Sequence, residues 1–173
     1  EDWQLESWGE EHEPNFRGSK YSASKMDGEA ELDDLEKCWI FRPRMFYSND
    51  WNSKNFVVKV SKYPTIVNAV NSVTHTTEFC KSIIKCIKSS APFGKYNMTH
   101  SQPIMTSEVL ELLGQYDKEW ITPDVFNEDM KTIGMAERSF TTLDSRKASL
   151  AGIGLSSDPM PLISESVEFN KKK

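Results

Sequence analysis

The residues of this chain that could do chemistry are mainly its cations, which gather in the middle of the sequence. Residues 37–100 carry ten Lys and Arg against two acids, a net charge of +8, whereas residues 1–36 carry −9 and residues 101–173 carry −4. A basic centre between acidic flanks is typical of a surface that binds an anion. The anionic-partner site predicted from this pattern consists of Arg42, Arg44, Lys59, Lys62, Lys81, Lys85 and Lys88.

Two alternatives remain open for these cations. Lysines on the outer side of an amphipathic helix are commonly only solvated, and the acidic N-terminal segment could pair with them in the same molecule. The overall charge of −5 excludes a dedicated duplex-DNA-binding protein, because such proteins need a strong excess of cations. If the site is functional, its partner is RNA, an acidic protein segment or an acidic membrane surface.

Apolar residues inside the acidic N-terminal segment suggest a second binding site. Large apolar side chains flanked by acids are typical of short segments that dock into a groove of a partner protein. The alternative is that they pack back onto their own domain. The residues predicted to bind a protein partner are Trp3, Leu5, Trp8 and Phe16.

Two positions have the spacing of phosphorylation sites. Arg146 and Lys147 stand three and two residues before Ser149, a pattern that basophilic kinases read, and Arg138 stands three residues before Thr141. A phosphate there would add roughly two negative charges and could redirect the segment onto the lysines. The sequence therefore predicts a phosphoprotein.

The common motifs for catalysis and for metal or nucleotide binding are absent. The three His and three Cys show no paired ligand spacing, and no glycines occur as G-x-G-x-x-G or G-K-[ST]. Most acids fall in segments predicted to be flexible, where burial would not prepare them for acid–base work. We therefore expect no enzyme, no cofactor and no metal, and an enzyme of unrecognised type remains an alternative.

The cysteines and the hydropathy bear on the compartment. Cys38, Cys80 and Cys86 have no paired spacing, so they do not form a disulfide framework and are typical of a reducing compartment. No basic-then-apolar leader and no long apolar run is present. We expect an intracellular protein, cytoplasmic or nuclear, for which the glycosylation sequon at Asn97 has no meaning.

The elements expected to position these residues form an α+β domain over residues 33–135. A β-hairpin over residues 36–63 is predicted from apolar alternation around Trp39 and again over 56–61, with Pro43 placing the first strand at an edge. Because a hairpin alone is marginally stable, we expect a third strand from residues 95–105 or a partner subunit, which leaves a homo-oligomer open.

Helices are predicted to cover this hairpin. Apolar residues step by four and three over residues 64–90, which indicates one long helix or a pair of helices broken near 74–77, where β-branched residues cluster. Two short helices follow: one is capped at Thr106 or Ser107, and the other begins after Thr122. Residues 1–32 are predicted to be an acidic flexible arm and residues 136–173 a flexible tail rich in Ser, Thr and Gly.

Together these features favour a non-catalytic adaptor or assembly domain that takes part in protein–protein interaction. Its basic face would bind an anionic partner and its acidic–aromatic arm would recruit a protein. The first alternative is a structural protein associated with nucleic acid or membrane, of the viral matrix or nucleocapsid-cofactor type.

Overall fold

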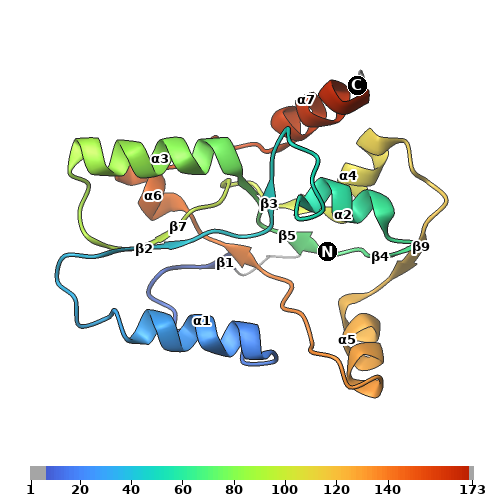
Figure 1. The fold of residues 1–173 in the computed structure, drawn as a ribbon, viewed down its shortest axis with the longest axis horizontal. Coiled ribbons are helices and arrows are strands. Elements are labelled where there is room, and N and C mark those ends of the chain that lie inside the picture. Colours follow the sequence, from blue (N-terminus) through green and yellow to red (C-terminus); the bar gives the residue numbers. More distant parts are fainter. Residues whose placement is uncertain (1–6, 172–173) are drawn as a thin grey trace, which may run out of the picture.

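A computed structural model describes residues 7–171, in which short strands alternate with helices (Figure 1). Within these residues every strand pairs with one neighbour only. In chain order the elements are β1 (Ser7–Trp8), α1 (Lys20–Ala30), β2 (Trp39–Arg42), β3 (Phe46–Tyr47), α2 (Phe56–Lys62), β4 (Thr65–Val67), β5 (Val70–Asn71), β6 (Thr74–His75), α3 (Thr76–Ser89), β7 (Gly94–Asn97), β8 (Ile104–Met105), α4 (Thr106–Leu113), β9 (Glu119–Ile121), α5 (Pro123–Thr132), β10 (Thr142–Leu143), α6 (Arg146–Leu150) and α7 (Met160–Lys171).

The longest strand pair is β2 with β7, which run parallel from Trp39 opposite Gly94 to Arg42 opposite Asn97. Parallel strands need a crossover connection, and here the crossover includes α3. In Figure 1, α3 and α6 lie on one side of this pair and α1 lies on the other. The pair is therefore the centre of a three-layer arrangement, helix–sheet–helix.

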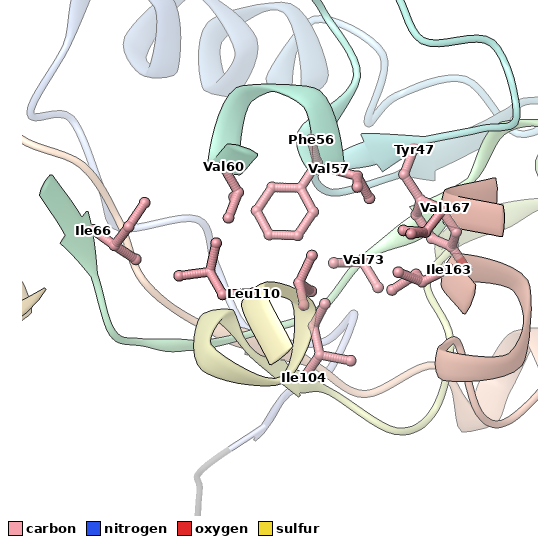
Figure 2. Packing of buried hydrophobic residues seen from close by; sticks show 11 residues of the cluster. Tyr47, Phe56, Val57, Val60, Ile66, Val73, Ile104, Leu110, Ile163 and Val167 are labelled. Atoms are coloured by element: carbon pink, nitrogen blue, oxygen red, sulfur yellow. The ribbon is translucent and has the colours of Figure 1, made fainter. Parts of the chain in front are cut away.

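The main apolar cluster lies beside this pair, between α2, α4 and α7. Figure 2 shows side chains from α2 and α4 pointing toward one another, with the Phe56 ring between them. The Trp51 indole nitrogen donates to Ser166 Oγ at 3.1 Å and so ties the loop before α2 to α7. The buried members are Tyr47, Phe56, Val57, Val60, Ile66, Val73, Ile104, Val109, Leu110, Ile163 and Val167.

A second apolar cluster joins the β2–β7 pair to α3 and α6. Tyr96 of β7 is buried against Cys86 of α3 and Ala148 of α6, with Phe41 of β2 packed at its edge. The Phe41 and Phe79 rings meet edge to face with centroids 6.2 Å apart. One face of the strand pair is thus apolar and closed.

The expected hairpin over residues 36–63 is not formed, and the helix predicted from residue 64 begins later. Residues 56–62 are helix α2, begun by Asn55, whose Oδ1 accepts from the Val57 backbone at 3.0 Å. A short apolar run is compatible with a buried helix as well as with a strand, and here the Asn55 cap favours the helix. Residues 65–75 form three short strands, so the long helix begins only at Thr76.

Three of the expected elements are confirmed. Helix α4 ends at Gly114, which has the left-handed conformation (φ 69°) that glycine adopts without steric cost. Helix α5 begins after Thr122, whose hydroxyl accepts from the Val125 backbone at 3.4 Å, with Pro123 in the first turn. The expected third strand corresponds to β7, although its partner is β2 in parallel.

The segments predicted to be flexible arms contain regular structure. β1 near the start of the chain pairs in parallel with β10, so residues far apart in sequence lie side by side. Ile163 and Val167 of α7 are fully buried in the main cluster. The low hydropathy of these segments hid a few well-placed apolar residues that long-range pairing buries. Among residues 7–171, no helix is long and apolar enough to cross a membrane.

Candidate active site

Helix α1 carries a tyrosine and a lysine one turn apart on the same face. Ser19 caps the helix by accepting from the Ser22 backbone at 3.0 Å, and this cap fixes where the turn containing Tyr21 begins. Residues four apart on a helix are neighbours, and Lys25 Nζ lies 5.5 Å from the centre of the Tyr21 ring. Tyr21 is 72% exposed. A phenol placed this way can give a proton to an external oxygen, and the ammonium stabilises the phenolate left behind.

Ion pairs hold α1 against the strand pair. Glu29 accepts from Arg42 Nε at 3.0 Å and also contacts Arg42 Nη2, while Lys95 Nζ lies 3.1 Å from the same carboxylate. Burial raises the pKa of Glu29, but hydrogen bonds from these two cations outweigh it and the net pKa is lowered. Lys95 also pairs with Asp33 at 2.7 Å, which is the main cause of its raised pKa.

None of the side chains of α1 is buried within residues 7–171. Its attachment is therefore polar, in contrast to the apolar attachment of α3. A cleft of about 480 Å³ separates α1 from the segment before it, lined by both acids and bases, including Glu10, Arg17 and Lys95. The helix stands at an open side of the molecule.

The carboxyl ends of β2 and β7 are surrounded by segments from elsewhere in the chain. Asn97 Nδ2 donates to the carbonyls of Trp8 at 2.8 Å and Asp144 at 2.9 Å, and its backbone nitrogen donates to Glu10 Oε1 at 2.7 Å. In open α/β sheets, ligands bind outside the carboxyl ends of parallel strands. This end of the pair is thus the expected position of a ligand.

A buried polar network lies near the junction of the two apolar clusters. Tyr47 Oη and His100 Nε2 are 2.9 Å apart, and His100 Nδ1 is 2.8 Å from the Ser156 carbonyl. Both side chains are completely buried; burial raises the pKa of Tyr47 and lowers that of His100. Enclosed side chains cannot touch a substrate, so this network is part of the scaffold.

The structure does not bring the seven predicted anion-binding cations onto one face. Arg42 is paired with Glu29, and Arg44 is directed inward, toward Asn71 and Ser139. The two arginines are separated from the lysines because the second strand of the expected hairpin, which would have carried Lys59 beside them, is a helix. The exposed lysines divide between α2 and α3: Lys59 and Lys62 on the former, Lys81, Lys85 and Lys88 on the latter.

The other predicted sites are scattered. Trp3 and Leu5 lie outside the described residues, whereas Trp8 and Phe16 are partly buried. Ser149 is exposed on α6, and Thr141 is partly buried beside β10. No group of three or more His, Cys, Asp or Glu within residues 7–171 is arranged to hold a metal ion.

Tyr21 and Lys25 are the functional candidates that the sequence reasoning missed. Their signal was present, because a Tyr-x-x-x-Lys spacing puts a phenol and an ammonium on one helix face. It was overlooked because the acidic segment around it showed no apolar periodicity. Helix α1 lacks such periodicity because none of its side chains is buried among residues 7–171.

No family model matches the chain, but known proteins do. It is 33% identical over 165 residues, 94% of its length, to a bifunctional dTDP-4-dehydrorhamnose 3,5-epimerase/dTDP-4-dehydrorhamnose reductase of Arabidopsis thaliana. It is 34% identical over 146 residues to a trifunctional UDP-glucose 4,6-dehydratase/UDP-4-keto-6-deoxy-D-glucose 3,5-epimerase/UDP-4-keto-L-rhamnose-reductase of the same plant. These relatives are sugar-nucleotide enzymes. The chain spans about half of the first, 54%, and 21% of the second.

Solved structures share the fold. The L780 UDP-rhamnose synthase of Acanthamoeba polyphaga mimivirus matches 94% of this chain and 56% of its own, with a TM-score of 0.79 at 24% identity. A dTDP-4-dehydrorhamnose reductase of Bacillus anthracis, solved in complex with NADP, matches 96% of this chain and 60% of its own, with a TM-score of 0.66 at 20% identity. The chain therefore has the fold of part of these Rossmann-like enzymes.

These similarities correct three expectations. The expectation of a non-catalytic adaptor is wrong, as is that of a protein that is no enzyme, because the relatives are epimerases and reductases of sugar nucleotides. The protein-interaction role expected from the charge pattern fails with them. The charge pattern misled because Arg42 is paired with Glu29, Arg44 is directed inward to neutral oxygens, and the lysines lie on two separate helices.

Proposed function

We propose that this chain is the substrate-side part of an enzyme that reduces the keto group of a nucleotide-linked 4-keto-6-deoxy sugar. The observation that carries the proposal is the exposed Tyr21–Lys25 pair on α1. The similarity to the Arabidopsis epimerase/reductase along almost the whole chain supports the proposal independently.

Reduction of a ketone adds a hydride to the carbon and a proton to the oxygen. A nicotinamide cofactor, such as the NADP bound to the Bacillus anthracis reductase, supplies the hydride when bound. In this chain Tyr21 Oη is the proton donor to the keto oxygen. The Lys25 ammonium holds the negative charge that then develops on the phenol oxygen.

The sequence of this chain contains no G-x-G-x-x-G turn, the motif whose backbone cradles a dinucleotide pyrophosphate. Among residues 7–171, β2 pairs with β7 alone, although parallel strands are usually part of a larger buried sheet. We infer that the part of the relatives that this chain does not span supplies the cradle and pairs with the other edge of β2.

Exposed apolar side chains support the same inference. Ile84 and Ile87 on α3 are 53% and 61% exposed, and Phe93 just before β7 is 46% exposed. Such residues bordering one strand pair are what an adjoining half of the sheet would cover.

The test joins this chain to the part of the Arabidopsis bifunctional enzyme that it does not span, and measures NADPH oxidation. The substrates are the UDP-linked and the dTDP-linked 4-keto sugars. We expect turnover by the unchanged chain, and a rate lower by about 10²–10⁴-fold in Tyr21→Phe, because proton donation typically contributes that much. Lys25→Met is expected to slow the same step.

The matched control is Tyr116→Phe, which removes the hydroxyl of an equally exposed tyrosine after α4 and should leave the rate unchanged. A folded chimera that binds NADPH but reduces neither sugar would contradict the proposed function. An unchanged rate in Tyr21→Phe would remove Tyr21 from the mechanism. We place this activity in a reducing intracellular compartment, because Cys38, Cys80 and Cys86 are all free.

A further inference from the structure

One arginine is partly enclosed and has no carboxylate partner among residues 7–171. Three of the five arginines contact an acid, with Arg17 2.9 Å from Asp27 and the other two held by Glu29 and Asp144. Arg138 is exposed and lies over the Phe126 ring, with its guanidinium carbon 5.4 Å from the ring centre. Arg44 alone is directed inward with no acid within reach among residues 7–171.

The partners of Arg44 are neutral oxygens. Its Nη2 donates to Asn71 Oδ1 at 2.9 Å and to the Ser139 carbonyl at 2.5 Å. Nε is enclosed and has no partner, and burial lowers the pKa of the guanidinium to about 10. Nη1 makes no hydrogen bond with the described residues and is not one of the enclosed atoms, so it still faces solvent. Arg44 as a whole is partly buried, and a partly buried cation without an anion lowers the stability of the folded protein, so a bound anion would compensate its charge.

The position of Arg44 is that of a ligand contact. It follows the end of β2 by two residues, at the carboxyl end of the parallel pair. The next residue, Met45, has a φ of 45°, a left-handed conformation that a side chain other than glycine rarely adopts. Strained backbone of this kind persists where surrounding structure holds it, and it concentrates at functional sites.

Two other elements hold the guanidinium in place. Asn71 belongs to β5, and Ser139 belongs to the segment between α5 and β10. Asn71 Oδ1 also accepts from the Thr141 backbone at 3.4 Å, so the same amide fixes both the arginine and this segment. Arg138 precedes Ser139, which brings the backbone of a second arginine without a carboxylate partner among the described residues next to the first.

We propose that Arg44 is an anion-binding residue, whose guanidinium receives a phosphate oxygen of a nucleoside diphosphate at the carboxyl end of β2. The ligand class rests on the proposed function, since a nucleotide-linked sugar carries a diphosphate. A phosphate would compensate the buried charge through a charge-assisted hydrogen bond to Nη1, which is the role for which a guanidinium is well suited. Arg44 would then fix the nucleotide end of the substrate while Tyr21 serves the sugar.

The test is calorimetric titration of the 173-residue chain with UDP, dTDP, NADPH and orthophosphate. We expect UDP or dTDP to bind, with affinity that falls as salt is raised. Arg44→Met should weaken this binding by about 10- to 100-fold, the usual effect of losing a hydrogen bond to a charged group. Arg44→Lys keeps the charge but loses the planar set of donors, so its affinity should be intermediate. Arg146→Met, which removes an exposed arginine of α6, should bind like the unchanged chain.

Thermal unfolding without ligand separates binding from support. An unpaired buried charge costs stability, so Arg44→Met should melt at the same temperature as the unchanged chain or higher. A markedly lower melting temperature of Arg44→Met, together with unchanged nucleotide affinity of Arg44→Lys, would show that Arg44 only stabilises the fold and would overturn the proposal. A loss of NADPH affinity in place of UDP or dTDP affinity would also overturn it, because the anion would then belong to the dinucleotide.

The remaining outcomes separate this proposal from the proposed function. Equal nucleoside diphosphate affinity in Arg44→Met and the unchanged chain would overturn the role of Arg44, while the reductase assay of the chimera would still decide the activity. Absence of binding by the unchanged chain would likewise remove the site at Arg44. A chimera inactive as a reductase, with diphosphate binding that depends on Arg44, would reject the activity and keep the site.

Discussion

The region around α2, α4 and α7 encloses its apolar side chains on all sides, whereas the β2–β7 pair is enclosed on one face only. In the first region Phe56, Leu110 and Val167 meet in one cluster (Figure 2). In the second, Phe41 and Tyr96 face α3 and α6, while the opposite face meets α1 through charges. The difference indicates that stability is concentrated in the first region, and the proposed substrate chemistry belongs to the second.

Alternation along the two strands produces the uneven second region. Successive residues of a strand point to opposite faces, so Phe41 is directed to one side and Arg42 to the other. Parallel sheets are usually covered by apolar contacts on both faces. A face that is closed by Glu29, Arg42 and Lys95 is held less firmly, and α1 should therefore open more easily than the helices of the main cluster.

The largest expected effect comes from deleting packed atoms in the main cluster. Leu110 of α4 is 1% exposed and belongs to this cluster. Leu110→Ala should lower the free energy of unfolding by about 2–5 kcal/mol, because it removes buried methyl groups and leaves a cavity. Chemical denaturation measures this loss.

Leu150→Ala is the control, since Leu150 on α6 is 90% exposed and its truncation should change stability by no more than about 0.5 kcal/mol. Similar losses in both variants would mean that the main cluster does not carry the stability, and would remove the contrast between the two regions.

A smaller effect is expected where α1 meets the strand pair. Glu29→Gln removes the carboxylate that Arg42 and Lys95 share, in a partly buried setting. It should lower stability by about 1–3 kcal/mol, the range for hydrogen bonds to charged groups. Hydrogen exchange should quicken in α1 while amides of α2 and α4 keep their protection.

Asp27→Asn provides the comparison, because it breaks the exposed pair between Asp27 and Arg17 on the same helix. Exposed pairs contribute about 0–1 kcal/mol. Faster exchange in α2 and α4 after Glu29→Gln would show that the two regions unfold together, and would contradict their difference in local stability.

The sequence was sufficient where local chemistry decided the structure. Gly114 ends α4 and Thr122 with Pro123 begins α5, because caps and terminators act through neighbouring residues. It was insufficient where distant segments meet. The pairing of β2 with β7 and of β1 with β10 joins residues tens of positions apart, and no local pattern encodes such a partner.

The candidate site was hidden for a related reason. Tyr21 and Lys25 lie on a helix that buries no side chain among residues 7–171, so its sequence carries no apolar stripe that would mark it as structured. Arg42 and Arg44 were predicted to share an outward, anion-binding face. Alternation places Arg42 on the face opposite Phe41, but the inward direction of Arg44 could not be read from it, because Pro43 and the left-handed Met45 interrupt the strand before β3.

The buried histidines predict a pH dependence. Burial lowers the pKa of both His100 and His75 in the folded protein, so the unfolded chain takes up protons first as the pH falls. Stability should therefore be full above about pH 6.5 and decline as the pH drops below it, by at most about 1.4 kcal/mol per pH unit for each histidine.

Melting temperature measured between about pH 7.5 and about pH 5, the range in which histidine titrates, tests this expectation. His100→Gln should lower stability at neutral pH, because Tyr47 loses its partner, but should make the decline shallower. His12→Gln changes a half-exposed ring before α1 and serves as the control. An equally steep decline without His100 would place the pH sensitivity elsewhere.

The smallest effect is expected on the outer side of α3, far from the open face of the strand pair. Lys81, Lys85 and Lys88 are exposed, and none forms an ion pair with residues 7–171. Changing all three to Gln should alter stability by less than about 1 kcal/mol, mostly through loss of a favourable cation in the last turn at Lys88. Nucleoside diphosphate affinity should stay within about twofold of the unchanged chain, because α1 and α3 lie on opposite sides of β2 and β7. If this variant instead lost more affinity than Arg44→Met, the anion would bind to the closed side of the sheet, and the division between a stable region and a chemical one would have to be redrawn.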